Sequence, residues 1–325
     1  LQQLEEAVGV VGTDACRDML GEERGQDRSK RSVDEQAPAF DVMEMMRVLD
    51  GEGRETWERM RQLLQEDDFE YEHELDTEAY RQQVLEWLER LADEGLGESS
   101  FPEEVGGDGD FQAFMSTFES LAMFDQSLVV KFGVQFGLFG GSIYFLGNEQ
   151  QHKKYLPDVA DLSLPGGFAM TELGHGSNVQ DLETTATYDA ETDEIVIDTP
   201  SDSARKEWIG NAAEHGQMVT VFAQLRVDGE EHGVHAFLVR IRDEEGRVRD
   251  GVTIEDCGHK MGLNGVDNGR IWFDDVRIPR GQMLDRHGTV DDDGEYDSPI
   301  PSKSKRFFTM IGTLVGGRVS VAAAS

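Results

Sequence analysis

The sequence predicts an α+β protein in which a helical segment, a segment of mostly antiparallel strands and a second helical segment follow one another. Three observations support this order. Apolar residues recur at helical spacing within 41–165, they alternate at strand spacing within 166–297, and helical character returns within 298–325. Two or three domains are expected, because a domain typically has roughly 100–200 residues and the chain has 325.

The charge of the chain excludes two classes of partner. Asp and Glu number 66 against 30 Lys and Arg, which gives a formal net charge of −36. Nucleic-acid phosphates and an anionic bilayer would both repel this protein. We also find no apolar run near the ~20 residues that a membrane helix needs. We therefore expect neither nucleic-acid binding nor membrane insertion.

The excess of carboxylates also bears on where the protein works. Their mutual repulsion is relieved in concentrated salt, which shortens the Debye length to a few Å. We interpret the chain as a halophilic, cytoplasmic protein of a salt-rich prokaryotic cytosol; the alternative is an acidic protein with no special habitat. The two cysteines, Cys16 and Cys257, indicate neither a disulfide framework nor a zinc motif, and they favour a reducing interior.

Both ends of the chain indicate a piece of a longer protein. Leu1 is not a start methionine, and residues 1–40 contain a long polar run that is typical of an extension or linker. The last residues, 309–325, are apolar and rich in small side chains. They are typical of the first turns of a packed helix that continues into a further helical domain.

Three helices are predicted in the first helical segment. The first lies between Asp76, an expected N-cap, and Gly95, an expected C′ glycine, and the other two span 111–124 and 128–146. Glycines weaken the last helix intrinsically, so we expect them to allow the close approach of another helix or of a ligand. The apolar stripe of the first helix is Tyr80, Val84, Trp87, Leu88 and Leu91, and the glycines of the last are Gly133, Gly137, Gly140 and Gly141.

Five strands are predicted in the middle segment. The clearest spans 218–227, where alternate residues are apolar and define one face. Asp- and Gly-rich turns separate the strands from one another. The remaining strands are 194–198, 234–241, 252–255 and 270–276.

Common catalytic and metal motifs do not occur in the sequence. It contains no GxSxG, HExxH or P-loop pattern. His232 and His235 form a near pair, but no third ligand accompanies them, so a role in a turn and strand is favoured over a metal site. No metal is expected.

Two glycine-containing segments carry the candidate site. In the first, GGFAMTELGHGSNVQ, Gly174 and Gly176 allow a tight path with exposed main-chain N–H groups, and Thr171 adds a hydroxyl that can donate and accept. In the second, EWIGNAAEH, Trp208 offers an apolar face and Gly210 gives access to the backbone. Each segment alone fits ordinary turns and a core tryptophan equally well.

Taken together, six runs of sequence resemble acyl-CoA oxidases, which are members of the acyl-CoA dehydrogenase superfamily. The runs occur in that family's order and approximate spacing, and the resemblance extends over residues 40–325. It implies an acyl-CoA dehydrogenase-like fold with an N-terminal helical domain, a middle β domain that contacts FAD, and a C-terminal helical bundle that is largely missing here. The runs are FAMTELGHGSNV, LETTATYD, WIGNAAEHG, GVHAFLVRIRD, DCGHKMGLNGVDNGRIWFDDVRIPR and RFFTMIGTLVGGRVSVAAAS.

The resemblance implies particular contacts with the flavin. Carried over by position, Thr171 would hydrogen-bond the edge of the isoalloxazine and Gly210 would present its main chain to the ring. A glycine at position 210 favours the oxidase branch, because many dehydrogenases have Ser or Thr near it. Further candidates in the same two motifs are Met170, Ser177, Trp208 and Ile209.

The resemblance also implies a reaction, in which FAD oxidises an acyl-CoA to a trans-2-enoyl-CoA and passes the electrons to O₂, giving H₂O₂. The family's glutamate base usually lies in the C-terminal bundle, beyond Ser325, and no carboxylate follows Asp297, so we assign no catalytic base. A solvent-facing or structural role is favoured for Glu172. Two alternatives stay open: an acyl-CoA dehydrogenase that uses an electron-transfer flavoprotein, and a non-catalytic flavin-binding fragment. The family forms homodimers or homotetramers.

Overall fold

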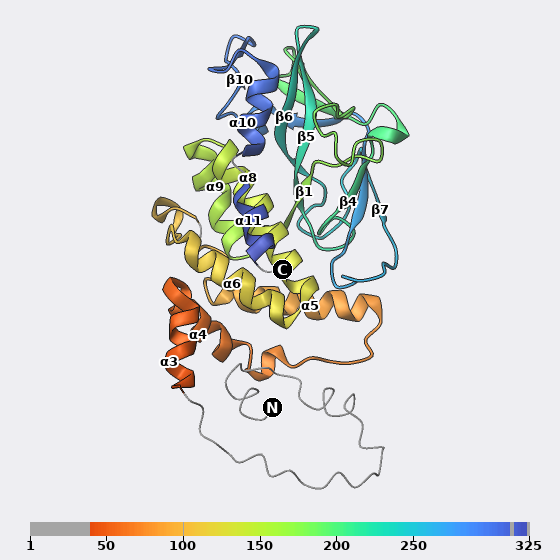
Figure 1. The fold of residues 1–325 in the computed structure, drawn as a ribbon. Coiled ribbons are helices and arrows are strands. Elements are labelled where there is room, and N and C mark those ends of the chain that lie inside the picture. The colour runs from red at the N-terminus through yellow and green to blue at the C-terminus, as the bar shows by residue number, and fades with distance from the viewer. Residues whose placement is uncertain (1–39, 100, 313–314, 324–325) are drawn as a thin grey trace. The chain divides into compact units, whose positions relative to one another are not determined.

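The computed structural model describes residues 40–99, 101–312 and 315–323 (Figure 1). The predicted extension over 1–40 lies outside these residues except for Phe40. The chain divides into two compact units, Leu1–Tyr71 and Glu72–Ser325. Each unit is described by itself below.

The described part of the first unit is made of short helices. Asp41 caps the first of them, because its carboxylate accepts the backbone N–H of Glu44 at 3.1 Å. Arg61 reaches back to Asp50 at 2.6 Å, and this ion pair ties the two α-helices together. The elements are α3 (Val42–Asp50), η1 (Gly51–Gly53), α4 (Arg54–Leu63) and η2 (Asp67–Phe69).

The second unit begins with the predicted helices. Asp76 caps α5 by accepting the N–H of Ala79 at 2.9 Å, and Gly95 follows the helix with a φ of +73°, so both predicted ends are confirmed. Four of the five stripe residues on α5 are buried, and Tyr80 is half-buried. The helices are α5 (Thr77–Asp93), η3 (Glu103–Val105), α6 (Phe111–Phe124), α7 (Gln126–Phe132), η4 (Gly133–Gly140), α8 (Gly141–Leu146) and α9 (Glu149–Ala160).

The glycine-rich helix forms as predicted, but its middle winds as a π-helix. The elements α7, η4 and α8 follow one another without a break, and η4 is the π-helical part. A Cβ atom on Gly133 would lie 2.9 Å from the ring of Phe118, and one on Gly137 would lie 3.3 Å from the ring of Phe114. Gly133 therefore lets Phe118 of α6 pack closely, whereas a Cβ atom at position 137 would require the ring of Phe114 to shift by only a few tenths of an ångström. A π-helical turn is also frequent at functional sites.

The same helix corrects one expectation. By length and composition, Gln126–Leu146 is apolar enough to cross a membrane, with a mean hydropathy of 1.4, whereas no such run was expected. However, 61% of its apolar window is buried inside the protein. A helix that is apolar all round and buried among other elements is typical of a protein core.

The strands of the described residues form one large sheet and two small ones. The large sheet has the order β1-β5-β2-β3-β9, and β6 pairs with β5. Within these sheets β1 and β2 run parallel to β5 and the other pairs are antiparallel, so the prediction of mostly antiparallel strands is confirmed. The large sheet contains β1 (Gly166–Ala169), β2 (Thr185–Asp189), β3 (Glu194–Asp198), β5 (Met218–Val227), β6 (Glu230–Arg240) and β9 (Val276–Pro279); the small sheets contain β4 (Lys206–Ile209), β7 (Val252–Asp256) and β8 (Gly269–Phe273), and β10 (Thr289–Val290) and β11 (Tyr296–Asp297).

Two of the predicted strands, 194–198 and 218–227, have the predicted bounds. The prediction of one strand over 270–276 is wrong. The strand β8 ends at Phe273, Asp275 takes a φ of +50°, and β9 then joins a different sheet. A left-handed residue interrupts an extended run, and the alternation of apolar residues does not reveal it.

Strand β5 connects the two hydrophobic cores of this unit. Val219 and Val221 belong to a core between the sheets, whereas Met218 and Phe222 pack with helix residues such as Phe139. Both faces of the strand are therefore buried. Figure 1 shows the helices α8 and α9 beside the sheet.

Helix resumes after the middle segment, as predicted. The two helices are α10 (Lys303–Gly312), which contacts β6, and α11 (Val315–Ala323), which contacts α6 and η4. The site described next lies where α11, η4 and the end of β1 meet.

Candidate functional site

The two segments that were predicted to carry the site lie side by side. The hydroxyl of Thr171 donates to the carbonyl oxygen of Glu207 at 2.7 Å, and the N–H of Glu207 donates back to the carbonyl oxygen of Thr171 at 3.0 Å. The N–H of Gly174 donates to Ser203 at 2.8 Å. The prediction that this glycine leaves its N–H exposed is therefore wrong, because the neighbouring segment uses it.

Trp208 projects from the site into solvent. The pairing of β4 with β8 shifts register between Lys206 and Ile209, and within this bulge Trp208 has a φ of +63°. Its side chain is 54% exposed, whereas Ile209 is buried. The alternative of a core tryptophan is therefore wrong. A bulky residue in the left-handed region is a local cost that surrounding structure must offset, and such residues cluster at functional sites.

Gly210 lies where three elements meet. A Cβ atom on Gly210 would lie 3.0 Å from a methyl group of Val134 in η4. A Cβ atom on Gly167 in β1 would lie 2.6 Å from the carbonyl oxygen of Gly210. Position 167 needs glycine because a Cβ atom there would clash with backbone, whereas a Cβ atom at position 210 would require Val134 to shift by a few tenths of an ångström.

A buried ion pair holds the turn that follows Gly210. The ammonium group of Lys131 in α7 contacts Asp267 at 2.5 Å and donates to the side chain of Asn211 at 2.7 Å. The other oxygen of Asp267 accepts the N–H groups of Glu214 and His215, both at 3.0 Å. Burial acts to raise the pKa of the Asp267 carboxyl, but Lys131 and His215 outweigh it and hold this pKa far below its usual range.

A buried arginine holds the same turn from another side. The guanidinium of Arg242 donates to the carbonyl oxygens of Gly216 at 2.7 Å, Ala212 at 2.9 Å and Ala213 at 2.7 Å. Lys131, Asp267 and Arg242 thus fix the backbone from Asn211 to Gly216. Gly210 is presented by a rigid turn, which is what a pre-organised binding site requires.

Glu172 is part of a second buried pair. One of its oxygens accepts from Lys206 at 2.9 Å and from the hydroxyl of Thr184 at 2.6 Å, and the other accepts the N–H of Glu183 at 2.7 Å. Burial lowers the pKa of Lys206 to about 8, although Glu172 acts in the opposite direction. The solvent-facing role for Glu172 is wrong and the structural one fits, because its carboxylate is buried and bound.

The remaining candidates differ in their surroundings. Met170 is buried at the end of β1, and its carbonyl oxygen accepts from Lys206 at 3.2 Å. Ser177 is exposed in the turn that follows. The structure brings Met170, Thr171 and Gly210 into one region and leaves Ser177 on the surface.

A mostly apolar cavity of about 400 Å³ adjoins this region. Its walls come from α6, from η4, from the end of β1 and from α10 and α11. Met170 therefore belongs both to the cavity and to the segment that carries Thr171. Among the lining residues are Phe114, Phe118, Gly133, Val134, Gly137 and Met170.

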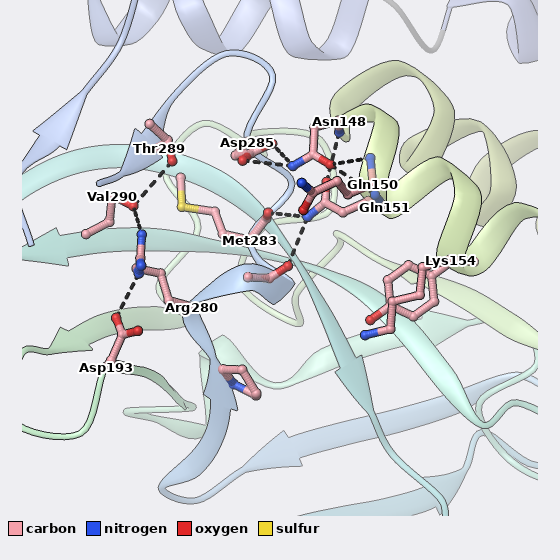
Figure 2. A pocket seen from close by; sticks show the side chains of 13 residues that line it. Asn148, Gln150, Gln151, Lys154, Asp193, Arg280, Met283, Asp285, Thr289 and Val290 are labelled. Atoms are coloured by element: carbon pink, nitrogen blue, oxygen red, sulfur yellow. Dashed lines mark hydrogen bonds and ion pairs between the residues drawn. The ribbon is translucent and has the colours of Figure 1, made fainter. Parts of the chain in front are cut away.

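A polar pocket of about 380 Å³ lies between α9 and the segment after β9 (Figure 2). Arg280 pairs with Asp193 at 2.7 Å, and Asn148 donates to both oxygens of Asp285 at 2.9 and 3.0 Å. The ammonium group of Lys154 lies 4.7 Å from the centre of the ring of Tyr155. The bonds from Asn148 to Asp285 fasten the start of α9 to the segment after β9, which is a structural use of these polar groups.

The two histidines considered for a metal pack against one tyrosine. The ring of His232 stacks on Tyr296 with 3.9 Å between centres, and His235 lies 2.9 Å from the tyrosine hydroxyl through its Nε2. Burial lowers the pKa of His235 to about 3. In the part of the chain that the structure describes, no group of three His, Cys, Asp or Glu residues is arranged to hold a metal ion.

The sequence-based prediction missed the residues that hold the turn after Gly210. Asp267 and Arg242 lie far from that turn in the sequence, and although both belong to runs that carry the family resemblance, nothing in those runs indicates that they contact the turn. Lys131 carried a signal, because it interrupts an apolar helix in a chain that has few lysines. A charged residue on such a helix is almost never fully buried unless it is paired.

Two family models match the chain. The N-terminal domain of acyl-CoA dehydrogenase matches residues 50–163, and the middle domain of acyl-CoA dehydrogenase matches residues 167–276. The chain belongs to the acyl-CoA dehydrogenase family. Within this family, the relatives and solved structures that it resembles are acyl-CoA oxidases.

Three of these relatives show how much of each chain the similarity covers. Peroxisomal acyl-coenzyme A oxidase 3 of Arabidopsis thaliana is 46% identical over 222 residues, which are 68% of this chain and 33% of the relative. Acyl-CoA oxidase 3 of Yarrowia lipolytica superposes with a TM-score of 0.75 at 33% identity, over 88% of this chain and 40% of that one. Acyl-CoA oxidase-1 of Caenorhabditis elegans, complexed with FAD and ATP, superposes with a TM-score of 0.63 at 30% identity, over 77% of this chain and 36% of that one. The chain thus spans less than half the length of these relatives.

The comparisons confirm the predicted family and the acyl-CoA dehydrogenase-like α+β fold, with its N-terminal helical domain and middle β domain. They correct the predicted location. The expectation of a cytoplasmic protein is wrong, because similar proteins of Arabidopsis thaliana and Homo sapiens are peroxisomal acyl-coenzyme A oxidases. Net charge reports on solubility and self-repulsion, and it carries no information about the compartment.

Proposed function

We propose that this chain is the N-terminal and middle part of an FAD-dependent acyl-CoA oxidase, which converts an acyl-CoA into a trans-2-enoyl-CoA and passes the electrons to O₂ to give H₂O₂. Membership of the acyl-CoA dehydrogenase family and the similarity to acyl-CoA oxidases support the proposal. The proposed organisation is an extension over 1–40, helical and β domains over 41–165 and 166–297, and the start of a helical bundle over 298–325.

The residues of the site fit FAD, which similar oxidases of known structure contain. An isoalloxazine has flat apolar faces and a polar edge. The exposed indole of Trp208 fits the faces, and the hydroxyl of Thr171 and the backbone of Gly210 fit the edge. The observation that carries the proposal is that Trp208, held in a left-handed bulge, directly follows the residue bonded to Thr171. We propose Ile209 and Met170 as supporting residues and Ser177 as a contact from the following turn.

When bound, the flavin accepts two electrons from the substrate and delivers them to O₂. The residues of this chain bind and orient the reactants. Within the flavin motif, Glu172 is unsuited to remove a proton, because Thr184, Glu183 and Lys206 already bind its carboxylate. We assign no catalytic base to the chain, and we propose that a glutamate of the remaining bundle removes the α-proton.

The apolar cavity supports an acyl-CoA as the substrate. It adjoins Met170, so an alkyl chain in the cavity would end beside the flavin segment. Removing such a chain from water is favourable by about 0.8 kcal/mol for each methylene group. We further propose a homodimer or homotetramer for the whole protein, supported by its membership of the acyl-CoA dehydrogenase family.

The test is to measure FAD binding and peroxide production separately. The proposal predicts that the purified chain binds FAD, and that the whole protein produces peroxide from palmitoyl-CoA in air without an added electron acceptor. Reduction of a dye without peroxide would instead identify an acyl-CoA dehydrogenase. FAD binding without any turnover by the whole protein would identify a non-catalytic flavin-binding protein.

A further inference from the structure

We propose that Lys206 is a positioning residue of the flavin site, whose buried ammonium group fixes the segment around Thr171 so that the threonine hydroxyl meets the flavin. This role rests on the proposed function, since it presupposes that the chain binds FAD. The side chain of Lys206 is fully buried. It therefore acts through Thr171 rather than by contact with a ligand.

The ammonium group of Lys206 holds the residues on both sides of Thr171. It donates to the carbonyl oxygen of Met170 at 3.2 Å and to the carboxylate of Glu172 at 2.9 Å. A third bond, of 2.7 Å to the carbonyl oxygen of Phe222 in β5, anchors the ammonium group to the large sheet. An ammonium group has three N–H donors, so these acceptors use all of them. One side chain thus fixes the segment around Thr171 to the sheet.

The neighbours of Lys206 in the chain bind the same segment through their backbone. The carbonyl oxygen of Glu207 accepts the hydroxyl of Thr171 at 2.7 Å, and its N–H donates to the carbonyl oxygen of Thr171 at 3.0 Å. The carbonyl oxygen of Arg205 accepts the N–H of Leu173, also at 3.0 Å. The direction of the threonine hydroxyl therefore depends on a backbone that Lys206 holds from the buried side.

The stability of the fold alone does not explain this lysine. Lys206 and Glu172 form a pair in which both side chains are fully buried. Burying two charges is costly, and such a pair is often no more stabilising than apolar residues of similar size. Arginine is the commoner cation of this chain, but its planar group does not fit three acceptors that surround one nitrogen atom. The geometry fits a residue that orients its neighbours.

The test variant is Lys206→Met/Glu172→Gln. Lys206→Met alone would leave the carboxylate of Glu172 buried without its cation, which destabilises a protein strongly, whereas the double change leaves no unpaired charge. Glu172→Gln alone keeps the ammonium bond to Met170 and so isolates the effect of the lysine. The matched control is Arg280→Met/Asp193→Asn, which removes an ion pair of 2.7 Å from the polar pocket of Figure 2, outside both flavin segments.

The experiment is a fluorescence titration of each purified chain with FAD. Lys206→Met/Glu172→Gln should raise the dissociation constant by about fivefold, which is the effect of one hydrogen bond to a ligand. In a chain that carries Thr171→Val, the same double change should raise it by less than about twofold, because the hydroxyl that Lys206 positions is already absent. The control pair should change it by less than about twofold in either chain.

Three results would overturn the proposal. The first is unchanged FAD affinity in the double variant. The second is a loss of affinity that is as large in the Thr171→Val chain as in the unmodified chain, because Lys206 would then not act through Thr171. The third is an equal loss in Glu172→Gln alone, which would assign the role to the carboxylate.

The melting temperature shows whether each variant folds. If the double variant does not fold, Lys206→Arg takes its place, because it keeps a cation beside Glu172 but cannot direct three N–H groups as an ammonium group does. It should weaken FAD binding with the same dependence on Thr171, and unchanged binding would contradict the role. An unmodified chain that binds no FAD would instead contradict the proposed function itself.

Discussion

The hydroxyl of Thr171 donates a hydrogen bond of 2.7 Å to the carbonyl oxygen of Glu207, 36 residues further along the chain. This bond joins the two segments of the candidate flavin site. It also uses the hydroxyl proton of Thr171, so the oxygen is left to accept a hydrogen bond from a ligand. The threonine therefore has two roles, and removing its hydroxyl should affect both.

Thr171→Val should weaken FAD binding. The change removes the bond to Glu207 and the acceptor offered to the flavin, and each such bond contributes about 1 kcal/mol. We expect the dissociation constant for FAD to rise by about fivefold to thirtyfold. The measurement is the ratio of flavin to protein absorbance after dialysis. Thr171→Ser keeps the hydroxyl and should retain FAD; equal retention by both variants would contradict the assignment.

Trp208→Gly should change stability and FAD binding in opposite directions. Trp208 has a left-handed φ of +63°. This conformation destabilises a non-glycine residue by roughly 1–2 kcal/mol, and glycine adopts it without that strain. The apo chain should therefore unfold at higher urea concentration, while its FAD affinity falls because the indole face is lost. Trp272→Phe, a change at a half-buried tryptophan of β8, is the control for general effects of losing an indole. A variant that gains stability and still binds FAD fully would show that Trp208 and its bulge do not contribute to FAD binding.

Periodicity predicted the elements whose side chains face a single environment. The bounds of α6 and β5 follow from apolar spacing alone, and Asp76 marked the start of α5. Strand β4 was missed because its bulge at Trp208 breaks the alternation over only four residues. The division between β8 and β9 was missed because it depends on the backbone of Asp275.

The candidate site was predictable only in part, and for a similar reason. Thr171 and Gly210 stood out through their motifs, and the structure brings them together. The ion pair of Lys131 and Asp267 joins residues 136 positions apart, and one sequence does not reveal which charges meet after folding.

Lys131→Met should destabilise the protein strongly. It leaves the carboxylate of Asp267 buried without its cation, and breaking a buried pair in this way costs roughly 3–5 kcal/mol. The free energy of unfolding in urea measures the loss. Lys153→Met replaces an exposed lysine of α9 and should change stability by less than about 0.5 kcal/mol. An equally small loss in Lys131→Met would show that the pair does not hold the turn.

Stability should fall as the pH decreases through the range set by His235. Its pKa is about 3 in the folded protein against a usual 6.5. Between these values the unfolded chain binds a proton that the folded chain does not, so stability is lost as the pH falls. His235 should contribute roughly 2 kcal/mol of loss between pH 6.5 and about pH 5. His235→Gln should flatten the dependence of the unfolding free energy on pH, and an unchanged slope in this variant would contradict the role given to His235.

Salt should stabilise the chain. A formal net charge of −36 repels itself at low ionic strength, and about 1 M salt shortens the Debye length to roughly 3 Å. We expect the melting temperature to rise steeply with KCl and to level off near that concentration. Sucrose at matched osmolality controls for exclusion of solutes from the surface. A melting temperature that is indifferent to KCl would show that repulsion among the carboxylates does not limit the stability of the chain.

The most direct test of the account is a titration of the purified chain with FAD, followed through the fluorescence of both the flavin and the tryptophans. The account predicts saturable binding of one FAD per chain, with quenching that is lost when Trp208 is replaced by alanine and affinity that falls in Thr171→Val. A chain that leaves FAD unbound, or that binds it equally well without Thr171 and Trp208, would contradict it.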